Sequence, residues 1–87
     1  MKRENACLGD LMVGWRKGAS LSQTALADAL GVQQATVSKL ESGTYRLSVL
    51  QLMAILDICG LTLSDVAKDI EQAVQADNRP IWERVNE

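Results

Sequence analysis

The chain has 87 residues, a length that suits one small domain, and 47% of them are hydrophobic while only 3% are aromatic. Its formal net charge is −2 and it has no histidine, so it lacks both the basic balance typical of nucleic-acid-binding proteins and the commonest general base of enzymes. No apolar run approaches the roughly 20 residues that span a bilayer and no signal-peptide pattern follows the N-terminus, which predicts a cytoplasmic protein with no membrane contact.

Two helices are predicted in the first third of the chain. The first covers residues 7–17, where apolar side chains recur at the spacing of one helical face: Leu8, Leu11, Met12 and Trp15. The second starts after Ser22, a residue type favoured at helix N-caps, and extends to about residue 30. Gly31 can adopt the left-handed conformation that ends many helices, so we expect it to close the second helix.

The third predicted helix covers residues 34–42 and ends at Gly43. It begins after Gln33, which caps a helix less well than serine or threonine does. The turn at Gly31 is short, so the second and third helices must cross at a steep angle, with the small Ala27 where they approach closest. The larger side chains expected in their shared core are Leu26, Leu30, Val32, Val37 and Leu40.

Two further helices complete the predicted fold. Ser48 is expected to cap the fourth helix, which runs to about Cys59, stops at Gly60 and is apolar on more than one face. Ser64 is expected to cap the fifth, which covers residues 64–76. The sequence therefore predicts an all-α, five-helix domain over residues 1–76 and a short C-terminal tail over residues 77–87. The apolar residues of that tail are Ile81, Trp82 and Val85.

The third helix carries polar side chains on its outer face: Gln33, Gln34, Thr36, Ser38 and Lys39. An α-helix fits the major groove of DNA, where glutamine can form two hydrogen bonds with adenine and lysine can contact guanine or phosphate. Residues 1–64 hold six basic and five acidic residues, whereas residues 65–87 hold three basic and six acidic ones. The acidity is thus concentrated near the C-terminus, which leaves room for a local basic face with weak non-specific affinity for DNA.

The combined spacing resembles the Xre or Cro/phage-repressor type of helix-turn-helix protein over about residues 8–68. The matching residues are Arg16, Leu21-Ser22-Gln23, Leu26-Ala27, Leu30-Gly31-Val32, Val37-Ser38, Leu40-Glu41-Ser42-Gly43 and Cys59-Gly60-Leu61. The resemblance implies a repressor-like helix-turn-helix fold whose third helix reads double-stranded DNA. The chain departs from the family pattern at Leu47, where a proline is frequent, and at Ala35, which can contact a thymine methyl group but cannot hydrogen-bond a base.

The resemblance also implies roles for individual residues. The positions that face bases are Gln34, Ala35 and Lys39, with Gln33 and Thr36 beside them. The positions that face phosphates are Gln23, Thr44, Tyr45 and Arg46. The resemblance further implies that Arg16 and Glu41 form a structural ion pair between the first helix and the end of the third.

The leading functional hypothesis is a repressor that binds a near-palindromic operator as a homodimer, because one domain this small buries little DNA surface. The dimer interface is expected on the fifth helix and the end of the fourth, with the tail as a further candidate. The alternative is an antitoxin or adaptor that binds DNA and also a partner protein through its C-terminal region. An enzyme is not expected, since the sequence has no histidine to activate a serine. Cys7 and Cys59 form no metal-binding pattern, so neither a metal nor a cofactor is expected.

Overall fold

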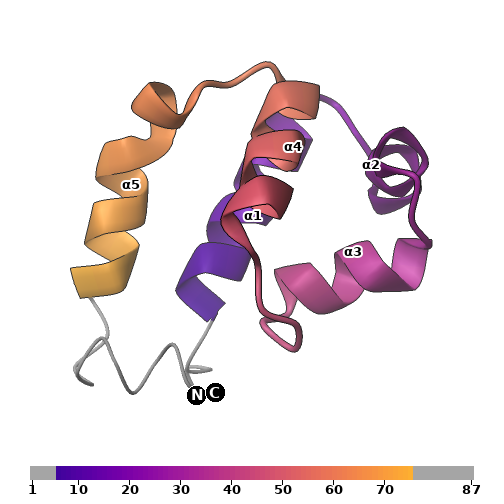
Figure 1. Cartoon of the computed structure of the whole chain (residues 1–87), viewed down its shortest axis with the longest axis horizontal. Coiled ribbons are helices and arrows are strands. Elements are labelled where there is room, and N and C mark those ends of the chain that lie inside the picture. Colours follow the sequence, from indigo (N-terminus) through magenta and orange to yellow (C-terminus); the bar gives the residue numbers. More distant parts are fainter. Residues whose placement is uncertain (1–5, 76–87) are drawn as a thin grey trace.

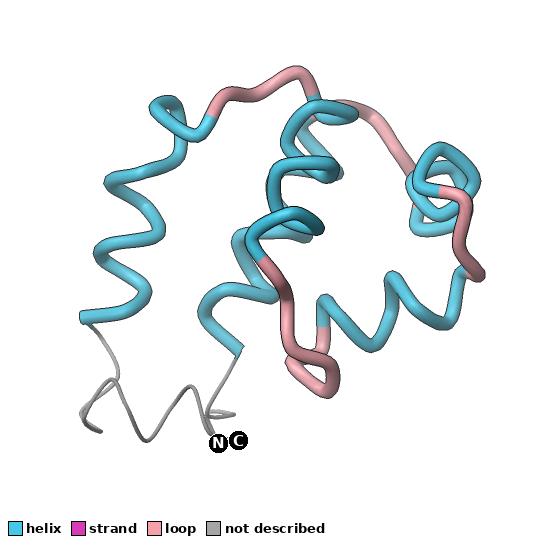
Figure 2. Tube along the Cα trace, viewed as in Figure 1, coloured by secondary structure: helices cyan, strands magenta, loops and turns pink. Residues whose placement is uncertain are grey.

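The computed structural model describes residues 6–75, which form five helices and contain no strand: α1 (Ala6–Gly18), α2 (Gln23–Leu30), α3 (Gln34–Glu41), α4 (Val49–Cys59) and α5 (Leu63–Gln75). The predicted all-α, five-helix fold is confirmed (Figure 2). None of the five helices has the length and apolar character needed to cross a membrane. The expected roles of the tail, residues 77–87, fall outside the described residues.

The helices are arranged around α1 and α4, which lie next to each other in the middle of the molecule (Figure 1). α5 packs along α1 on one side, while α2 and α3 lie on the other side and contact each other closely. α1 also contacts α3, and α2 contacts α4. The α2–α3 pair is therefore held against the central helices at one edge of the fold. In the view of Figure 1, α3 lies below α2.

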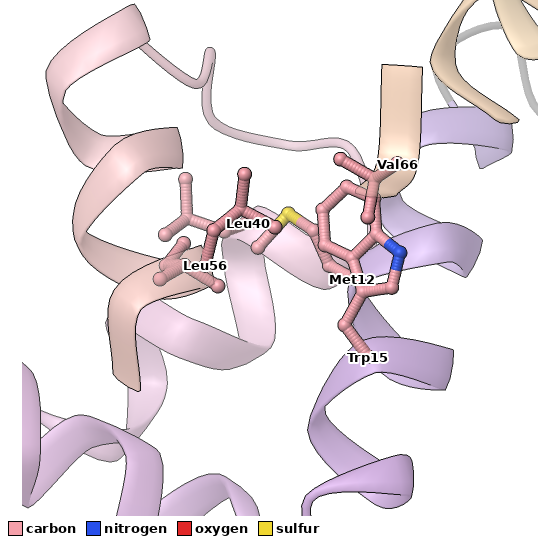
Figure 3. Close-up of a cluster of buried hydrophobic side chains, with 6 residues drawn as sticks. Met12, Trp15, Leu40, Leu56 and Val66 are labelled. Atoms are coloured by element: carbon pink, nitrogen blue, oxygen red, sulfur yellow. The ribbon is translucent and has the colours of Figure 1, made fainter. Parts of the chain in front are cut away.

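Two clusters of buried side chains hold this arrangement together. The larger one joins four helices (Figure 3) and consists of Met12, Trp15, Leu40, Ile55, Leu56 and Val66. The smaller one lies between α2 and α3 and consists of Leu26, Ala27 and Val37. Complete burial of one such aliphatic side chain stabilises a fold by about 1.5–3 kcal/mol. Val32, expected in this shared core, is instead 40% exposed, because it lies in the turn after α2.

Helix ends follow the predicted pattern at four places and differ at a fifth. The hydroxyl of Ser22 accepts a hydrogen bond from the Ala25 amide at 3.0 Å, and Gly31 and Gly60 both end helices with φ of 77°. At the start of α4 the side chains of Ser48 and Gln51 exchange hydrogen bonds with each other's backbone amides.

The prediction that Ser64 caps the fifth helix is wrong, because α5 begins one residue earlier, at Leu63. The hydroxyl of Thr62 accepts from the Asp65 amide at 3.2 Å, and the Asp65 carboxylate accepts from the Thr62 amide at 2.9 Å. This reciprocal pair has the geometry of a capping box. The hydrogen bonds from Thr62, the backbone amide first, lower the pKa of Asp65.

Gly9 allows a close approach between α1 and α3. A Cβ atom at this position would overlap with the backbone carbonyl of Glu41. The absence of a side chain therefore allows the first turn of α1 to lie against the C-terminal end of α3, where Glu41 is buried.

Candidate nucleic-acid interface

The first turns of α3 present an open surface. Gln33, Gln34 and Ala35 are exposed, and Thr36 is half-buried. Gln33 is the N-cap residue of α3, and its side chain makes no capping hydrogen bond, as expected for a glutamine at that position. The start of the helix thus combines exposed amide side chains with backbone N–H groups, which suits contact with base edges and phosphates.

A buried ion pair supports the end of the same helix. The guanidinium of Arg16 donates from Nε to Glu41 Oε2 at 2.7 Å and from Nη2 to Glu41 Oε1 at 3.2 Å. These side chains are only 9% and 5% exposed, respectively. The remaining Nη1 group donates to the carbonyl of Leu21 at 2.9 Å, in the segment that leads into α2. One arginine therefore links the first three helices.

The ion pair continues into a chain of amide side chains. Gln23, the first residue of α2, donates from Nε2 to Glu41 Oε1 at 2.9 Å. The Oε1 atom of Gln23 in turn accepts a hydrogen bond of 2.6 Å from Nε2 of Gln34, on the exposed side of α3. The structure thus brings together Arg16, Glu41, Gln23 and Gln34. Two of these were expected to face DNA and two to form a structural pair.

Lys39 and Tyr45 are brought together on the neighbouring surface. The Lys39 ammonium donates to the Tyr45 hydroxyl at 3.2 Å and lies 5.0 Å from the centre of its ring. An ammonium group over an aromatic face is attracted by the ring's electrons. Both side chains are exposed, so a cation from α3 is held next to the loop that follows it.

The loop between α3 and α4 is ordered by short polar contacts. The hydroxyl of Ser42 donates to the Lys39 carbonyl at 3.1 Å and lies 2.9 Å from the hydroxyl of Thr44. The backbone amides of Thr44 and Tyr45 both donate to the same Lys39 carbonyl. Arg46 follows and is exposed. The expected phosphate-binding positions 44–46 therefore lie on one structured loop, whereas Gln23 lies at the start of α2.

Sequence reasoning did not find the contacts of Gln23 with Glu41 and Gln34. These partners are 18 and 11 residues away in the chain, so helical periodicity carries no signal for them. Their meeting depends on the crossing angle of α2 and α3 and on how closely α1 approaches α3.

The described residues contain no cluster that could hold a metal ion. The thiol of Cys59 is half-buried, and burial raises its pKa while the charge of Arg16 opposes the shift. A neutral, partly buried thiol is a poor nucleophile, so this residue adds no reactive group to the interface.

Comparison with known proteins gives two findings. A protein-family model described as helix-turn-helix matches residues 15–66. The crystal structure of the clp gene regulator ClgR from C. glutamicum superimposes with a TM-score of 0.71, at 22% sequence identity, over 83% of this chain and 92% of that chain. No curated protein sequence matches the chain. The matched segment contains the whole surface described above, from Arg16 through α3 to Arg46.

Proposed function

The chain belongs to the helix-turn-helix family of DNA-binding transcription regulators, whose model spans more than half of its length. We propose that it is a repressor that binds a near-palindromic operator as a homodimer. The observation that carries the proposal is the exposed start of α3, where Gln34 is already held by a hydrogen-bonded partner. A side chain fixed before binding loses less conformational entropy when it meets a base.

The proposed contacts divide into two groups. Base edges are read from α3 by Gln33, Gln34, Ala35, Thr36 and Lys39. Phosphates are contacted by Gln23, Thr44, Tyr45 and Arg46. Contacts of the first kind carry sequence preference, whereas contacts of the second kind fix the position of the protein on the duplex.

Apolar side chains on the surface support the homodimer. At the start of α4, Leu50 is 82% exposed, Val49 72% and Met53 41%. The apolar residues at the end of α4 instead pack into or against the two core clusters. We therefore place the proposed interface on the start of α4 rather than on its end, together with α5. The proposed partner is a second copy, since two copies related by a two-fold axis would place one α3 on each half of a near-palindromic operator.

Selection of bound duplexes from a random DNA pool tests this function. The expected result is an inverted repeat whose half-sites are separated by about one helical turn, roughly 10 base pairs. Placing the selected sequence across a promoter in a purified transcription reaction should then lower transcript yield when the protein is added. A pool in which no sequence is enriched would overturn sequence-specific binding, and raised transcription would overturn the repressor assignment.

A further inference from the structure

The ammonium group of Lys39 is held by Tyr45, a residue of the loop that follows α3. We propose that Tyr45 is a positioning residue for base reading, which holds this ammonium in one place so that Lys39 selects guanine. The inference rests on the proposed base-reading role of Lys39. It goes beyond that role by naming the base that is read, and by giving Tyr45 a part in sequence preference in addition to its proposed phosphate contact.

The backbone of the loop brings the two residues together. Gly43 reverses the chain after α3 with φ of 82°, a left-handed conformation that glycine adopts without strain. The carbonyl of Lys39 then accepts hydrogen bonds from the amides of Thr44 and Tyr45, at 2.9 and 3.3 Å respectively. It also accepts a hydrogen bond of 3.1 Å from the hydroxyl of Ser42. The loop is therefore folded back onto the residue whose side chain it meets.

Lys39 and Tyr45 are thus joined at two points. Their backbones share the hydrogen bond from the Tyr45 amide, and their side chains share a hydrogen bond of 3.2 Å from the Lys39 ammonium to the Tyr45 hydroxyl. A lysine side chain on a surface samples many rotamers and loses this freedom when it binds. The side-chain contact restricts the ammonium before DNA is met, and a group that is fixed in advance loses less entropy on binding.

The direction of the side-chain hydrogen bond follows from the chemistry of its members. An ammonium group carries three donor hydrogens and no acceptor, so the hydroxyl oxygen of Tyr45 must be the acceptor. Two N–H groups of Lys39 remain for an external partner. The hydroxyl hydrogen of Tyr45 also remains and can be donated to a phosphate oxygen, so the positioning role and the proposed phosphate contact of Tyr45 are compatible.

Lys39 therefore presents only donors to a base. In the major groove guanine offers two neighbouring acceptors, N7 and O6, whereas adenine places the N6 amino donor beside its N7 acceptor. Thymine offers one acceptor, O4, and cytosine offers a donor. Two N–H groups directed from a fixed point match guanine best. An ammonium that is free to move can instead turn to a phosphate, a contact that carries no sequence preference.

The test measures the preference for guanine at one base pair. The probes are the duplex selected from the random pool and duplexes in which a single base pair is changed, and the readout is the ratio of their Kd values. Lys39→Met locates the base pair read by this residue, where the selected duplex should carry guanine and where the ratio should fall by about tenfold. Lys17→Met removes an exposed cation from α1 and should leave the ratio unchanged.

Tyr45→Phe keeps the aromatic ring and removes only the hydroxyl. It should reduce the ratio at the Lys39 base pair by about threefold and leave the ratios at other base pairs unchanged. The loss of its phosphate contact weakens all duplexes alike and cancels in the ratio. In a Lys39→Met background, Tyr45→Phe should have no further effect on the ratio, a pattern that general destabilisation does not produce. Circular dichroism checks that each variant is folded.

A third variant tests whether Tyr45 acts by holding the cation. Arginine presents a rigid planar fork that meets guanine through two parallel hydrogen bonds without outside support. Lys39→Arg should therefore keep the preference for guanine, and Tyr45→Phe should lower the ratio less in this background than in the wild type. An equal effect in both backgrounds would overturn the positioning role, because the hydroxyl would then contribute independently of the lysine.

The outcomes separate this inference from the proposed function. If Tyr45→Phe retains the full preference for guanine while Lys39→Met loses it, the positioning role is overturned and the reading role of Lys39 stands. If Lys39→Met leaves every ratio unchanged, the inference is overturned while sequence-specific binding stands, and a salt slope reduced by about one unit would then identify a phosphate contact. A base other than guanine at the located pair overturns the assignment of guanine. Only a random pool without enrichment removes the proposed function as well.

Discussion

At the scale of single residues, the ion pair between Arg16 and Glu41 has the largest expected effect on stability. Arg16→Ala leaves the Glu41 carboxylate with only the neutral amide of Gln23 as a donor among its observed partners. Removing one member of a fully buried pair costs about 3–5 kcal/mol. We expect the free energy of unfolding, measured with urea, to fall by an amount of this order. Lys17→Ala removes an exposed cation from the same helix and should change the free energy of unfolding little. Equal stability of the Arg16 variant and the wild type would contradict a structural role for the pair.

Two glycines of α1 allow an equally direct comparison. A methyl group at Gly9 would overlap with the Glu41 carbonyl, whereas nothing lies within 4 Å of the corresponding position at Gly14. Gly9→Ala should therefore destabilise the fold by about 1–3 kcal/mol or more, because two backbones must move apart. Gly14→Ala should stabilise it by about 0.5–1 kcal/mol through improved helix propensity. Thermal unfolding of both variants measures the difference, and a Gly9 variant as stable as wild type would show that α1 and α3 are not in close contact.

Sequence reasoning at this scale proposed side chains for the DNA interface but did not predict how those side chains are connected to one another. Arg16 and Glu41 were paired through a family resemblance, and the structure places them within hydrogen-bonding distance. Gln23 and Gln34 were assigned separately to phosphate and base, because an amide side chain shows no preferred partner in the sequence. Val32 was placed in the core for its apolarity alone, but the chain turns at Gly31 and leaves it on the surface. Contacts that depend on how helices cross cannot be obtained from periodicity within a helix.

At the scale of elements, helix ends were predicted well where one residue type decides them. Ser22 and Ser48 cap helices and Gly31 and Gly60 end them, because cap hydroxyls and left-handed glycines act locally. The start of α5 was misplaced because the segment contains two candidate hydroxyl residues, Thr62 and Ser64. Only Thr62 has an acidic residue three positions later, and this is the signal that distinguishes the two.

This difference gives a test of the α5 start. Thr62→Ala removes the acceptor of the Asp65 amide and should cost about 1 kcal/mol of stability, the usual effect of losing an N-cap. Ser64 lies inside the helix and is exposed, so Ser64→Ala should be neutral or slightly stabilising. Urea unfolding of the two variants measures both effects. The reverse order of stabilities would place the helix start at Ser64.

At the scale of the whole molecule, the net charge of −2 limits how many phosphates the protein can neutralise. One lost phosphate contact should therefore be a large fraction of all the phosphate contacts that the protein makes. Arg46→Ala should weaken binding to all duplexes alike and reduce the slope of log affinity against log salt by about one unit. Titrations of operator and scrambled duplexes over a range of salt concentrations measure this. Lys17→Ala is the matched control, and an unchanged slope in the Arg46 variant would exclude that residue from the phosphate contacts.

The apolar start of α4 leads to the last prediction. Leu50 is 82% exposed in the single chain, so Leu50→Glu should leave the fold intact but place two carboxylates near the two-fold axis of the proposed dimer. Light scattering should show a dimer for the wild type and a monomer for this variant. Operator affinity should fall steeply, because the two recognition helices are no longer held about 34 Å apart, one turn of DNA. Arg46→Ala provides the converse control, since it should weaken DNA binding and remain dimeric. A wild-type protein that is monomeric at high concentration, both alone and on its operator, would contradict the homodimer.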